Sequence, residues 1–329
     1  MVSIKDVAKH AGVAISTVSK VLNGYPNISE DTRKKVNQAV EELHYLPNSV
    51  AAALSSKQAG RVALMIDLNV KTQAIDEIAM RYISGAITKA MELNLDVTTI
   101  FSFMFQQKTT EELIRYLRSQ SITGIIIFGV REENLALKEL IEKEAFKCVI
   151  VDADRVGRWT SSVSIDQKRA QYAVAEKMLE NFQGKKVLYI CGDESSYVSV
   201  KRLEGIRCLA REMNLELMIE QADFSEVKAR RLVKRLGEEA DAIVCASDLM
   251  AIGARNALKE MEIERPVCGF DGISLMAYAG QGMYTIHQNF SEISARAMEE
   301  VQWLMNGKEG RQVEMGYRLV QMNYDDMID

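Results

Sequence analysis

The sequence predicts a small all-α head followed by an α/β body of two lobes, each a doubly wound parallel sheet. The first 46 residues show short helical patterns separated by turn residues. From Arg61 onward, β-type apolar runs alternate with amphipathic stretches, and one stretch of the body repeats 120 residues further on. Alternating strands and helices build parallel sheets that are covered by helices.

Composition narrows the class of protein. The 329 residues are 47% hydrophobic and 26% charged, which indicates a globular chain and excludes a disordered or collagen-like one. No apolar run reaches the roughly 18 residues that a membrane span needs, and Met1–Asp6 contains no apolar export segment. The five Cys are scattered and odd in number, which favours buried thiols over a disulfide frame or a zinc site. We therefore expect a cytoplasmic protein that does not enter a membrane.

Charge is distributed unevenly along the chain. Residues 1–57 contain seven Lys/Arg and five Asp/Glu, a net of +2, whereas the other 272 residues contain 34 and 41, a net of −7. A basic head on an acidic body could contact nucleic-acid phosphates while the body stays away from them. A small excess of this kind also fits an ordinary solvated face, so charge alone leaves both interpretations open.

The head begins with two short helical patterns. Ser3 with Asp6 three residues later resembles a capping box at a helix start, and Gly12 breaks that helix. A second apolar pattern follows and stops at Asn23-Gly24, which are turn residues. Two short helices joined by a turn that contains glycine follow the helix-turn-helix plan.

A third helix completes the head. Ser29 is a good N-cap for a helix that continues to His44, and Pro47 ends the domain, which we place at 1–46. Residues 47–60 are expected to form a hinge helix and linker, because 48–57 contains helix-forming residues but is too short to hold a helix unaided.

The body, residues 61–329, carries the α/β alternation. The predicted strands are Val62–Ile66, Val97–Phe101, Ile125–Phe128, Cys148–Val151, Val187–Ile190, Ala242–Cys245 and Val267–Phe270. The helical stretches between them include Asp76–Leu93, Glu111–Ser119, Tyr197–Met213 and Val227–Leu236.

The repeat within the body aligns residues 85–97 with 205–217 without gaps, and each copy leads into a predicted strand. We infer two similar lobes, the first at about 61–163 and 291–322 and the second at about 164–290. Ligands favour the cleft between such lobes and the carboxyl ends of parallel strands.

Several motifs resemble the lactose-repressor (LacI) family of bacterial transcription regulators. The head carries SIKDVAKHAGVAISTVSKVLN at 3–23, ISEDTRKKV at 28–36, HYLPN at 44–48 and VAAAL at 50–54, and the body carries SDLMAIG at 247–253 and GFDG at 269–272. The resemblance covers nearly the whole chain. It implies a head that reads DNA and a body like that of periplasmic binding proteins.

The resemblance assigns DNA contacts to the second helix and to the hinge. The first residues of the second helix of a helix-turn-helix reach base edges in the major groove. Paired hinge helices of a dimer enter the minor groove in this family, where Leu54 would wedge open a base step. The implied DNA-binding residues are Ile15, Ser16, Thr17, Lys20, Asn23, Asn48, Ala51 and Leu54.

The resemblance also implies a ligand site between the lobes. Arg202 stands where the family has an effector-clamping Arg, Asp152 and Asp271 follow predicted strands, and Phe224 matches an aromatic on which sugars stack. The expected effector-binding residues are Arg202, Asp271, Asp248, Asp152, Gln288 and Phe224. Asp248 could equally be a helix N-cap. Three acidic side chains disfavour a phosphorylated ligand and favour a neutral polyol.

The predicted function is a sequence-specific DNA-binding repressor controlled by a sugar, acting as a homodimer because a two-fold operator needs two heads. A nucleoside or nucleobase acting as co-repressor is the alternative effector. A transporter's solute-binding protein fits the body but leaves the head unexplained. An enzyme is not expected and no cofactor is predicted: phosphate-binding glycine motifs are absent, and His287 is the only histidine outside the head.

Overall fold

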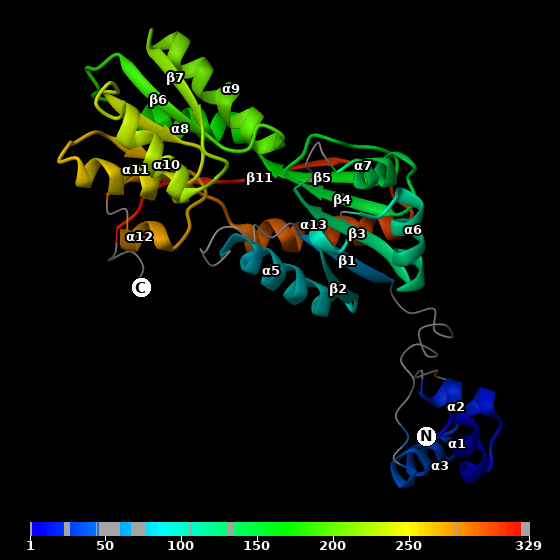
Figure 1. The fold of residues 1–329 in the computed structure, drawn as a ribbon. Coiled ribbons are helices and arrows are strands. Elements are labelled where there is room, and N and C mark those ends of the chain that lie inside the picture. The colour runs from blue at the N-terminus through cyan, green and yellow to red at the C-terminus, as the bar shows by residue number, and fades with distance from the viewer. Residues whose placement is uncertain are drawn as a thin grey trace. The chain divides into compact units, whose positions relative to one another are not determined.

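The computed structural model describes residues 2–22, 27–43, 45, 60–66, 77–105, 107–129, 134–279 and 282–323. The chain divides into two compact units, residues 1–59 and 60–329 (Figure 1). The predicted positions Asn23, Asn48, Ala51 and Leu54 lie outside the described residues. No helix among the described segments is both long enough and apolar enough to span a bilayer.

The described residues of the first unit form the helices α1 (Ile4–Ala11), α2 (Ile15–Leu22) and α3 (Glu30–Glu42). Local capping sets their ends. The Asp6 carboxylate accepts a hydrogen bond from the Ser3 amide at 2.8 Å, Gly12 ends α1 with φ of 66°, and the Ser29 hydroxyl accepts from the Thr32 amide. The predicted helical head is confirmed. Its core consists of Val7, Ala8, Val18, Val21, Val36, Ala39 and Tyr45.

The first lobe of the body is a six-stranded sheet in the order β11-β5-β4-β3-β1-β2 with every strand parallel (Figure 1). Its strands are β1 (Arg61–Ile66), β2 (Asp96–Phe101), β3 (Ile122–Phe128), β4 (Lys147–Val151), β5 (Thr160–Ile165) and β11 (Gln312–Met315). Its helices are α5 (Glu77–Leu93), α6 (Thr110–Ser119), α7 (Leu135–Glu142) and α13 (Phe290–Met305), with the 3-10 turn η1 (Ser102–Met104) after β2.

The second lobe is a six-stranded sheet in the order β12-β10-β9-β8-β6-β7. Its strands are β6 (Lys186–Cys191), β7 (Glu216–Gln221), β8 (Ala242–Cys245), β9 (Val267–Cys268), β10 (Tyr284–His287) and β12 (Arg318–Gln321), and only β12 is antiparallel to its neighbour. Its helices are α8 (Gln167–Met178), α9 (Tyr197–Glu212), α10 (Glu226–Leu236), α11 (Asp248–Glu260) and α12 (Leu275–Ala279).

The internal repeat corresponds to the same unit in each lobe. Residues 85–97 form the end of α5 and the start of edge strand β2, and residues 205–217 form the end of α9 and the start of edge strand β7. Gly85 and Gly205 head the two copies for the same reason. A Cβ at Gly85 would overlap the Ser291 carbonyl oxygen of α13, and one at Gly205 would overlap the Lys168 carbonyl oxygen of α8. Each glycine therefore lets two helices pack closely.

One lobe boundary differs from the prediction. Residues 291–322 were expected in the first lobe, but β12 pairs with β10 of the second lobe, with Thr285 opposite Val320. Of the elements in that segment, only α13 and β11 belong to the first lobe. The chain therefore passes between the lobes after β5, between β10 and α13, and between β11 and β12. The β12 strand covers an edge of the second sheet that would otherwise be unpaired.

Candidate functional site

The helix α2 presents a polar face and buries an apolar one. Val18 and Val21 are fully or nearly fully buried in the head core, whereas Ser16 and Lys20 are exposed and Ile15 is 44% exposed. Ile15 therefore lies outside the core of the head, where it could meet DNA. Ala14 supplies only its backbone carbonyl to the start of the helix, accepting from the Thr17 and Val18 amides.

A chain of hydrogen bonds crosses the body from one lobe to the other. In the first lobe, the Tyr82 hydroxyl of α5 donates to Asp152 Oδ2 at 3.1 Å. Asp152 follows β4 and has φ of 56°, a left-handed conformation that turns its side chain away from the strand direction. The side-chain amide of Gln167, at the start of α8, donates a hydrogen bond from Nε2 to Asp152 Oδ1 at 2.9 Å. Gln167 thereby connects the lobes.

The chain continues through Arg202, which is 3% exposed. Its Nε donates to Gln167 Oε1 at 2.9 Å, and its Nη1 donates to the Ala246 carbonyl at 2.6 Å and to Asp271 Oδ1 at 3.2 Å. The guanidinium carbon also lies 3.8 Å from the centroid of the Phe270 ring. Burial makes each of these contacts electrostatically stronger than it would be in water.

Gln288 ends the chain. Its Nε2 donates to Asp271 Oδ1 at 3.2 Å, while its buried Oε1 accepts no hydrogen bond from any residue that the structure describes. Four of the six predicted effector residues, Arg202, Asp271, Asp152 and Gln288, therefore belong to one continuous polar network. Gln167 and Tyr82 belong to it too and were missed, because a Gln or Tyr within a helical pattern gives no local signal of a distant partner.

The charges in this network do not balance. In the described part of the network, Arg202 is the one guanidinium and Asp152 and Asp271 are the two carboxyl groups, while Asp248 lies outside its hydrogen bonds but close enough to act on Asp271. Burial raises the pKa of Asp271, the Arg202 charge opposes that rise, and the neighbouring Asp248 adds to it. Burial likewise raises the pKa of Asp152, again against the opposing charge of Arg202. The network therefore favours protonation or a ligand that donates hydrogen bonds.

Asp248 is fully buried, and both of its carboxylate oxygens are occupied. Oδ2 accepts from the Gly272 amide at 2.7 Å and the Ile273 amide at 2.9 Å, and Oδ1 accepts from the Thr285 hydroxyl at 2.6 Å. Burial raises its pKa, and these hydrogen bonds oppose the rise. The helix cap is supplied by Ser247 instead, whose hydroxyl accepts from the Met250 amide. Asp248 therefore fixes the loop that carries Asp271.

The aromatic candidate Phe224 packs against Gly192. It occupies the turn between β7 and α10, where Asp223 and Phe224 both have positive φ, 50° and 58°. Its ring lies against Gly192, which follows β6, and a Cβ at position 192 would overlap the ring. Gly192 is thus required for the present position of Phe224.

A second polar contact joins the lobes outside this network. The Ser274 amide, just before α12, donates to both carboxylate oxygens of Glu77 at 3.0 and 2.9 Å. Arg81 donates to the Ser274 hydroxyl at 3.0 Å and pairs with Glu77 at 2.6 Å. Glu77 and Arg81 belong to α5 of the first lobe. Among the described residues, this contact joins the lobes in addition to the one through Gln167.

An aromatic cluster lies beside Asp152. The ring of Tyr82 lies 4.5 Å from that of Phe128, at the end of β3, and 5.2 Å from that of Phe290, at the start of α13. All three side chains are buried. The cluster fixes the Tyr82 hydroxyl where it meets the carboxylate.

Comparison with known proteins gives two family matches and many relatives. Residues 3–48 match the model described as bacterial regulatory proteins, lacI family, and residues 66–309 match the periplasmic binding protein domain. The transcriptional regulator RegA of Clostridium saccharobutylicum is 28% identical over 321 residues, and catabolite control protein A of Staphylococcus xylosus is 27% identical over 322 residues; each alignment covers 93% of both chains.

Solved structures share the fold. The Lac repressor dimer bound to operator and the anti-inducer ONPF superposes with a TM-score of 0.81 at 22% identity, covering 97% of this chain and 98% of the other. The complex of the transcriptional regulator CelR with cellobiose gives a TM-score of 0.70 at 21% identity, with the same coverage.

Proposed function

Since the chain belongs to the lacI family of bacterial regulatory proteins and is a DNA-binding transcriptional regulator, we propose that it is a homodimeric cytoplasmic repressor whose effector is a sugar. The sugar binds between the two lobes of the body. The observation that carries this proposal is the buried network in which Asp152 of one lobe and Arg202 of the other share Gln167. The body performs no catalysis.

The network's charge favours a neutral polyol. With Asp152 and Asp271 beside one guanidinium, the network has no net positive charge to attract an anion, whereas sugar hydroxyls can donate to Asp152 and Asp271 and accept from Arg202. The unpartnered Oε1 of Gln288 is one further acceptor for a hydroxyl. The cellobiose bound by CelR supports a sugar as the ligand class for this fold. Asp248 acts as a positioning residue for the loop rather than as a ligand contact.

Regulation follows from the lobe contacts. A ligand shifts an equilibrium between two conformations only by its difference in affinity for them. A sugar hydroxyl could replace the side-chain amide of Gln167 as the hydrogen-bond donor to Asp152. The direct hydrogen bond between the lobes would then be replaced by a contact through the ligand. The resulting change in lobe angle would reach the segment 47–60, which enters the body at β1. We propose that this segment is the hinge that grips DNA.

DNA is read by α2 and gripped by the hinge. The exposed Ile15, Ser16 and Lys20 lie on one side of α2, with Thr17 partly exposed beside them. Lys20 can donate to guanine acceptors, and Ile15 can pack on a thymine methyl. The proposed hinge contacts are Asn48, Ala51 and Leu54, and Asn23 is proposed to contact a phosphate.

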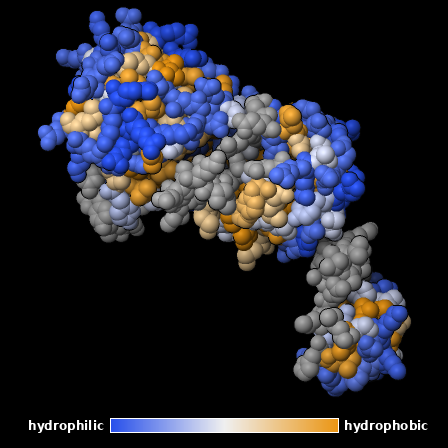
Figure 2. Space-filling model, viewed as in Figure 1, coloured by the Kyte–Doolittle hydropathy of each residue, from blue (hydrophilic) through white to orange (hydrophobic). Residues whose placement is uncertain are grey.

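An exposed apolar face on the first lobe supports the dimer. Met80, Ile87 and Met91 follow one another along α5 and are 59%, 42% and 75% exposed. Phe103 and Met104 of η1, just beyond edge strand β2, are also exposed. Figure 2 shows apolar surface gathered over α5 and β2. Monomers seldom leave large contiguous apolar patches in water, so a second copy of this chain is the proposed cover.

A thermal-shift screen with sugars and nucleosides tests the effector. A sugar is expected to raise the melting temperature of the wild-type protein and of Arg207→Lys, an exposed position on the same helix as Arg202. Arg202→Lys keeps the charge but loses the guanidinium fork, so it should lose the shift while binding operator normally. A shift by nucleosides alone would overturn the sugar assignment.

Operator binding is tested by gel shift on palindromic duplexes selected from a random library. Lys20→Ala should weaken binding to the selected duplex by roughly tenfold or more, and the matched change Lys9→Ala on α1 should weaken it far less. Leu54→Ala should lower operator affinity without changing effector binding. Equal losses of operator and effector binding in Leu54→Ala would contradict the wedge role.

A further inference from the structure

The three residues that follow Asp271 are held by carboxylates from both lobes. The backbone amides of the first two donate to Asp248, which belongs to the same lobe. The third amide, that of Ser274, donates to Glu77 of α5 in the first lobe, and the Ser274 hydroxyl donates to the same carboxylate at 2.9 Å. We call residues 271–274 the effector loop. One part of this loop is thus fixed within the second lobe, and its end is fixed by the first lobe.

The Glu77 carboxylate is itself held in place by Arg81, one turn further along α5. The Arg81 guanidinium pairs with Glu77 at 2.6 Å and donates to the Ser274 hydroxyl at 3.0 Å. The two side chains are 25% and 32% exposed, so water reaches them only in part. Hydrogen bonds to ionised groups are stronger than those between neutral groups and fix the geometry of their partners. The contact therefore holds the effector loop in one position relative to α5.

From this contact, α5 runs along α13. The Arg81 carbonyl accepts a hydrogen bond from Ser291 Oγ at 3.2 Å, and a Cβ at Gly85 would overlap the Ser291 carbonyl oxygen. Between these two points, the ring of Tyr82 meets that of Phe290 edge to face. Protein interiors are so closely packed that they transmit strain from one element to the next. A displacement of the start of α5 therefore displaces the start of α13.

The other end of α13 lies where the proposed hinge enters the body. Gly60 is the last residue of the segment 47–60 and directly precedes β1. A Cβ at Gly60 would overlap the terminal methyl carbon of Met305, the last residue of α13. The backbone at Gly60 therefore lies against the end of this helix. At 1.5 Å per residue, the 16 residues of α13 connect the effector site to the hinge over about 24 Å.

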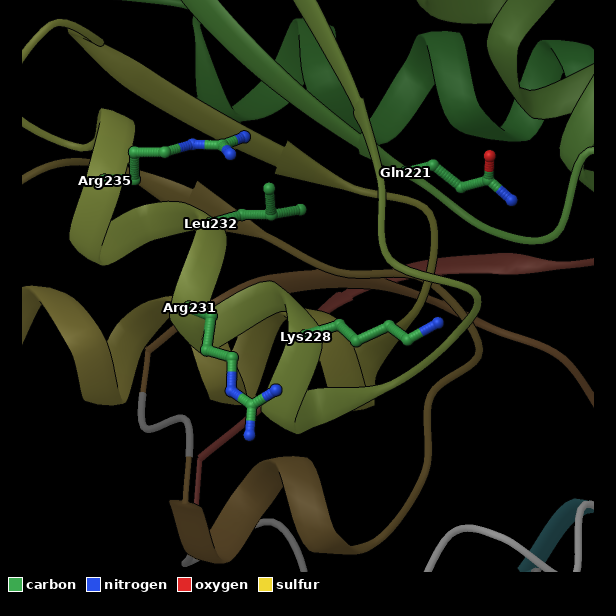
Figure 3. Close-up of a pocket in the computed structure, with 5 residues that line it drawn as sticks. All are labelled: Gln221, Lys228, Arg231, Leu232 and Arg235. Atoms are coloured by element: carbon green, nitrogen blue, oxygen red, sulfur yellow. The ribbon is translucent and has the colours of Figure 1, made fainter.

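The ion pairs beside the surface hollow on α10 stay within the second lobe, in contrast to the Glu77 contact. Figure 3 shows the side chains that line this hollow, Gln221, Lys228, Arg231, Leu232 and Arg235. Lys228 pairs with Asp223 in the turn after β7. Arg235 pairs with Glu220 of β7 at 3.2 Å. Loss of such a pair changes the surface charge of the second lobe without releasing it from the first.

We propose that Glu77 is a positioning residue through which the effector loop controls the hinge, and this inference rests on the ligand site and the hinge proposed above. A ligand that contacts Asp271 moves the loop that Glu77 holds. The movement passes from α5 to α13 and then to the backbone at Gly60, where the hinge segment ends. The two protomers of a dimer thus present their hinge segments to DNA in a position that depends on the effector loop.

A gel shift of the full chain on the selected operator duplex tests the proposal. Without the Glu77 contact, α5 and the effector loop move independently, and the two hinge segments lose their matched positions. Glu77→Ala should therefore lower operator affinity roughly fivefold or more, the size of a typical coupling between sites. Glu77→Gln keeps an acceptor for the Ser274 amide and should lose less. The matched control Arg235→Gln, which breaks the pair with Glu220, should change affinity less than about twofold.

A double variant tests whether the contacts from Glu77 to Met305 act as one unit. Met305→Ala should also lower operator affinity. Glu77→Ala combined with Met305→Ala should lose no more than the larger single loss, whereas independent losses would multiply. Circular dichroism checks the helix content of each variant. If Glu77→Ala loses helix content, Arg81→Gln, which releases the same carboxylate, takes its place under the same criteria.

The possible outcomes distinguish the role of Glu77 from the proposed function as a whole. Losses that multiply in the double variant, or equal affinities of Glu77→Ala and Arg235→Gln, would overturn the role of Glu77 and leave operator binding intact. A wild-type protein that binds no selected duplex would overturn the proposed function, and the role of Glu77 with it.

Discussion

Gln167 donates a hydrogen bond to Asp152 across 2.9 Å, and the two residues belong to different lobes. Asp152 ends a strand of the first sheet and Gln167 opens the first helix of the second lobe. The oxygen of the same side-chain amide, Oε1, accepts a hydrogen bond from Arg202 Nε. One neutral side chain thus stands between a carboxylate and a guanidinium, which makes it the residue whose loss should most directly separate the lobes.

Gln167→Leu should lower the free energy of unfolding of the body. It leaves Asp152 Oδ1 and Arg202 Nε without the hydrogen bonds that they share with Gln167, and a buried polar atom that loses its partner costs about 1–3 kcal/mol. Chemical denaturation of the two proteins measures the difference. X-ray scattering in solution should also give a larger radius of gyration for the variant, because a polar contact between the lobes is lost.

Gln171→Leu is the matched control, one helical turn further along α8. Gln171 is fully buried, and neither polar atom of its side-chain amide has a hydrogen-bond partner within the described part of the chain. Replacing an unsatisfied buried amide with an apolar side chain of similar shape should leave stability unchanged or raise it by about 1 kcal/mol. If both variants lose the same free energy of unfolding, the contact of Gln167 between the lobes does not stabilise the body in the way proposed.

Asp248→Ala should destabilise the second lobe by more than a typical substitution. It removes the hydrogen-bond acceptor of two backbone amides, those of Gly272 and Ile273, and of the Thr285 hydroxyl. At about 1–3 kcal/mol for each stranded group, a loss of several kcal/mol is expected at pH 7. Asp248→Asn keeps an acceptor for the two amides and should lose much less. Urea denaturation followed by circular dichroism compares the three proteins, and equal losses in the two variants would contradict the role of the acceptor.

Stability should depend on pH through the buried carboxylates. The pKa of Asp248 is raised by burial above the ordinary aspartate value of about 4. A raised pKa in the folded state means that its favourable contribution is present below about pH 4 and is lost as pH rises toward neutrality. The unfolding free energy of wild-type protein should therefore fall, relative to that of Asp248→Asn, between about pH 4 and pH 7. Denaturation curves across that range measure it, and a constant difference would refute the assignment.

Gly205→Ala should destabilise the packing of α8 on α9. The added methyl group would overlap the Lys168 carbonyl oxygen, and overpacking of this kind typically costs about 1–3 kcal/mol. Gly85→Ala should have a similar effect on α5 and α13 in the first lobe. Gly316→Ala, where an added Cβ meets nothing within 4 Å, is the control. Melting temperatures of the three variants test whether the two repeat glycines are equivalent.

Sequence patterns predicted the elements that depend on local chemistry. The head helices begin and end near their predicted capping residues, and the predicted helix Val227–Leu236 corresponds to Glu226–Leu236. The motif residues Arg202 and Asp271 were expected near one another and lie 3.2 Å apart. These features are encoded by neighbouring residues or by a motif of fixed spacing.

Long-range features were not predictable in the same way. Tyr82 and Gln167 meet Asp152 from positions 70 and 15 residues away, and nothing in their own segments marks either as part of a site. The change of lobe between β11 and β12 takes place within two residues, Gly316 and Tyr317. A pattern that short indicates a turn but not the sheet to which the next strand belongs.

The three passages of the chain between its lobes limit how the body can be divided. A fragment of 166–289 would contain every helix of the second lobe but would leave the β10 edge bare where β12 should pair. Bare strand edges recruit other chains, so such a fragment should aggregate unless a peptide carrying 318–321 is supplied or fused. Because these three connections tie the lobes together, a ligand should change the angle between the lobes rather than separate them.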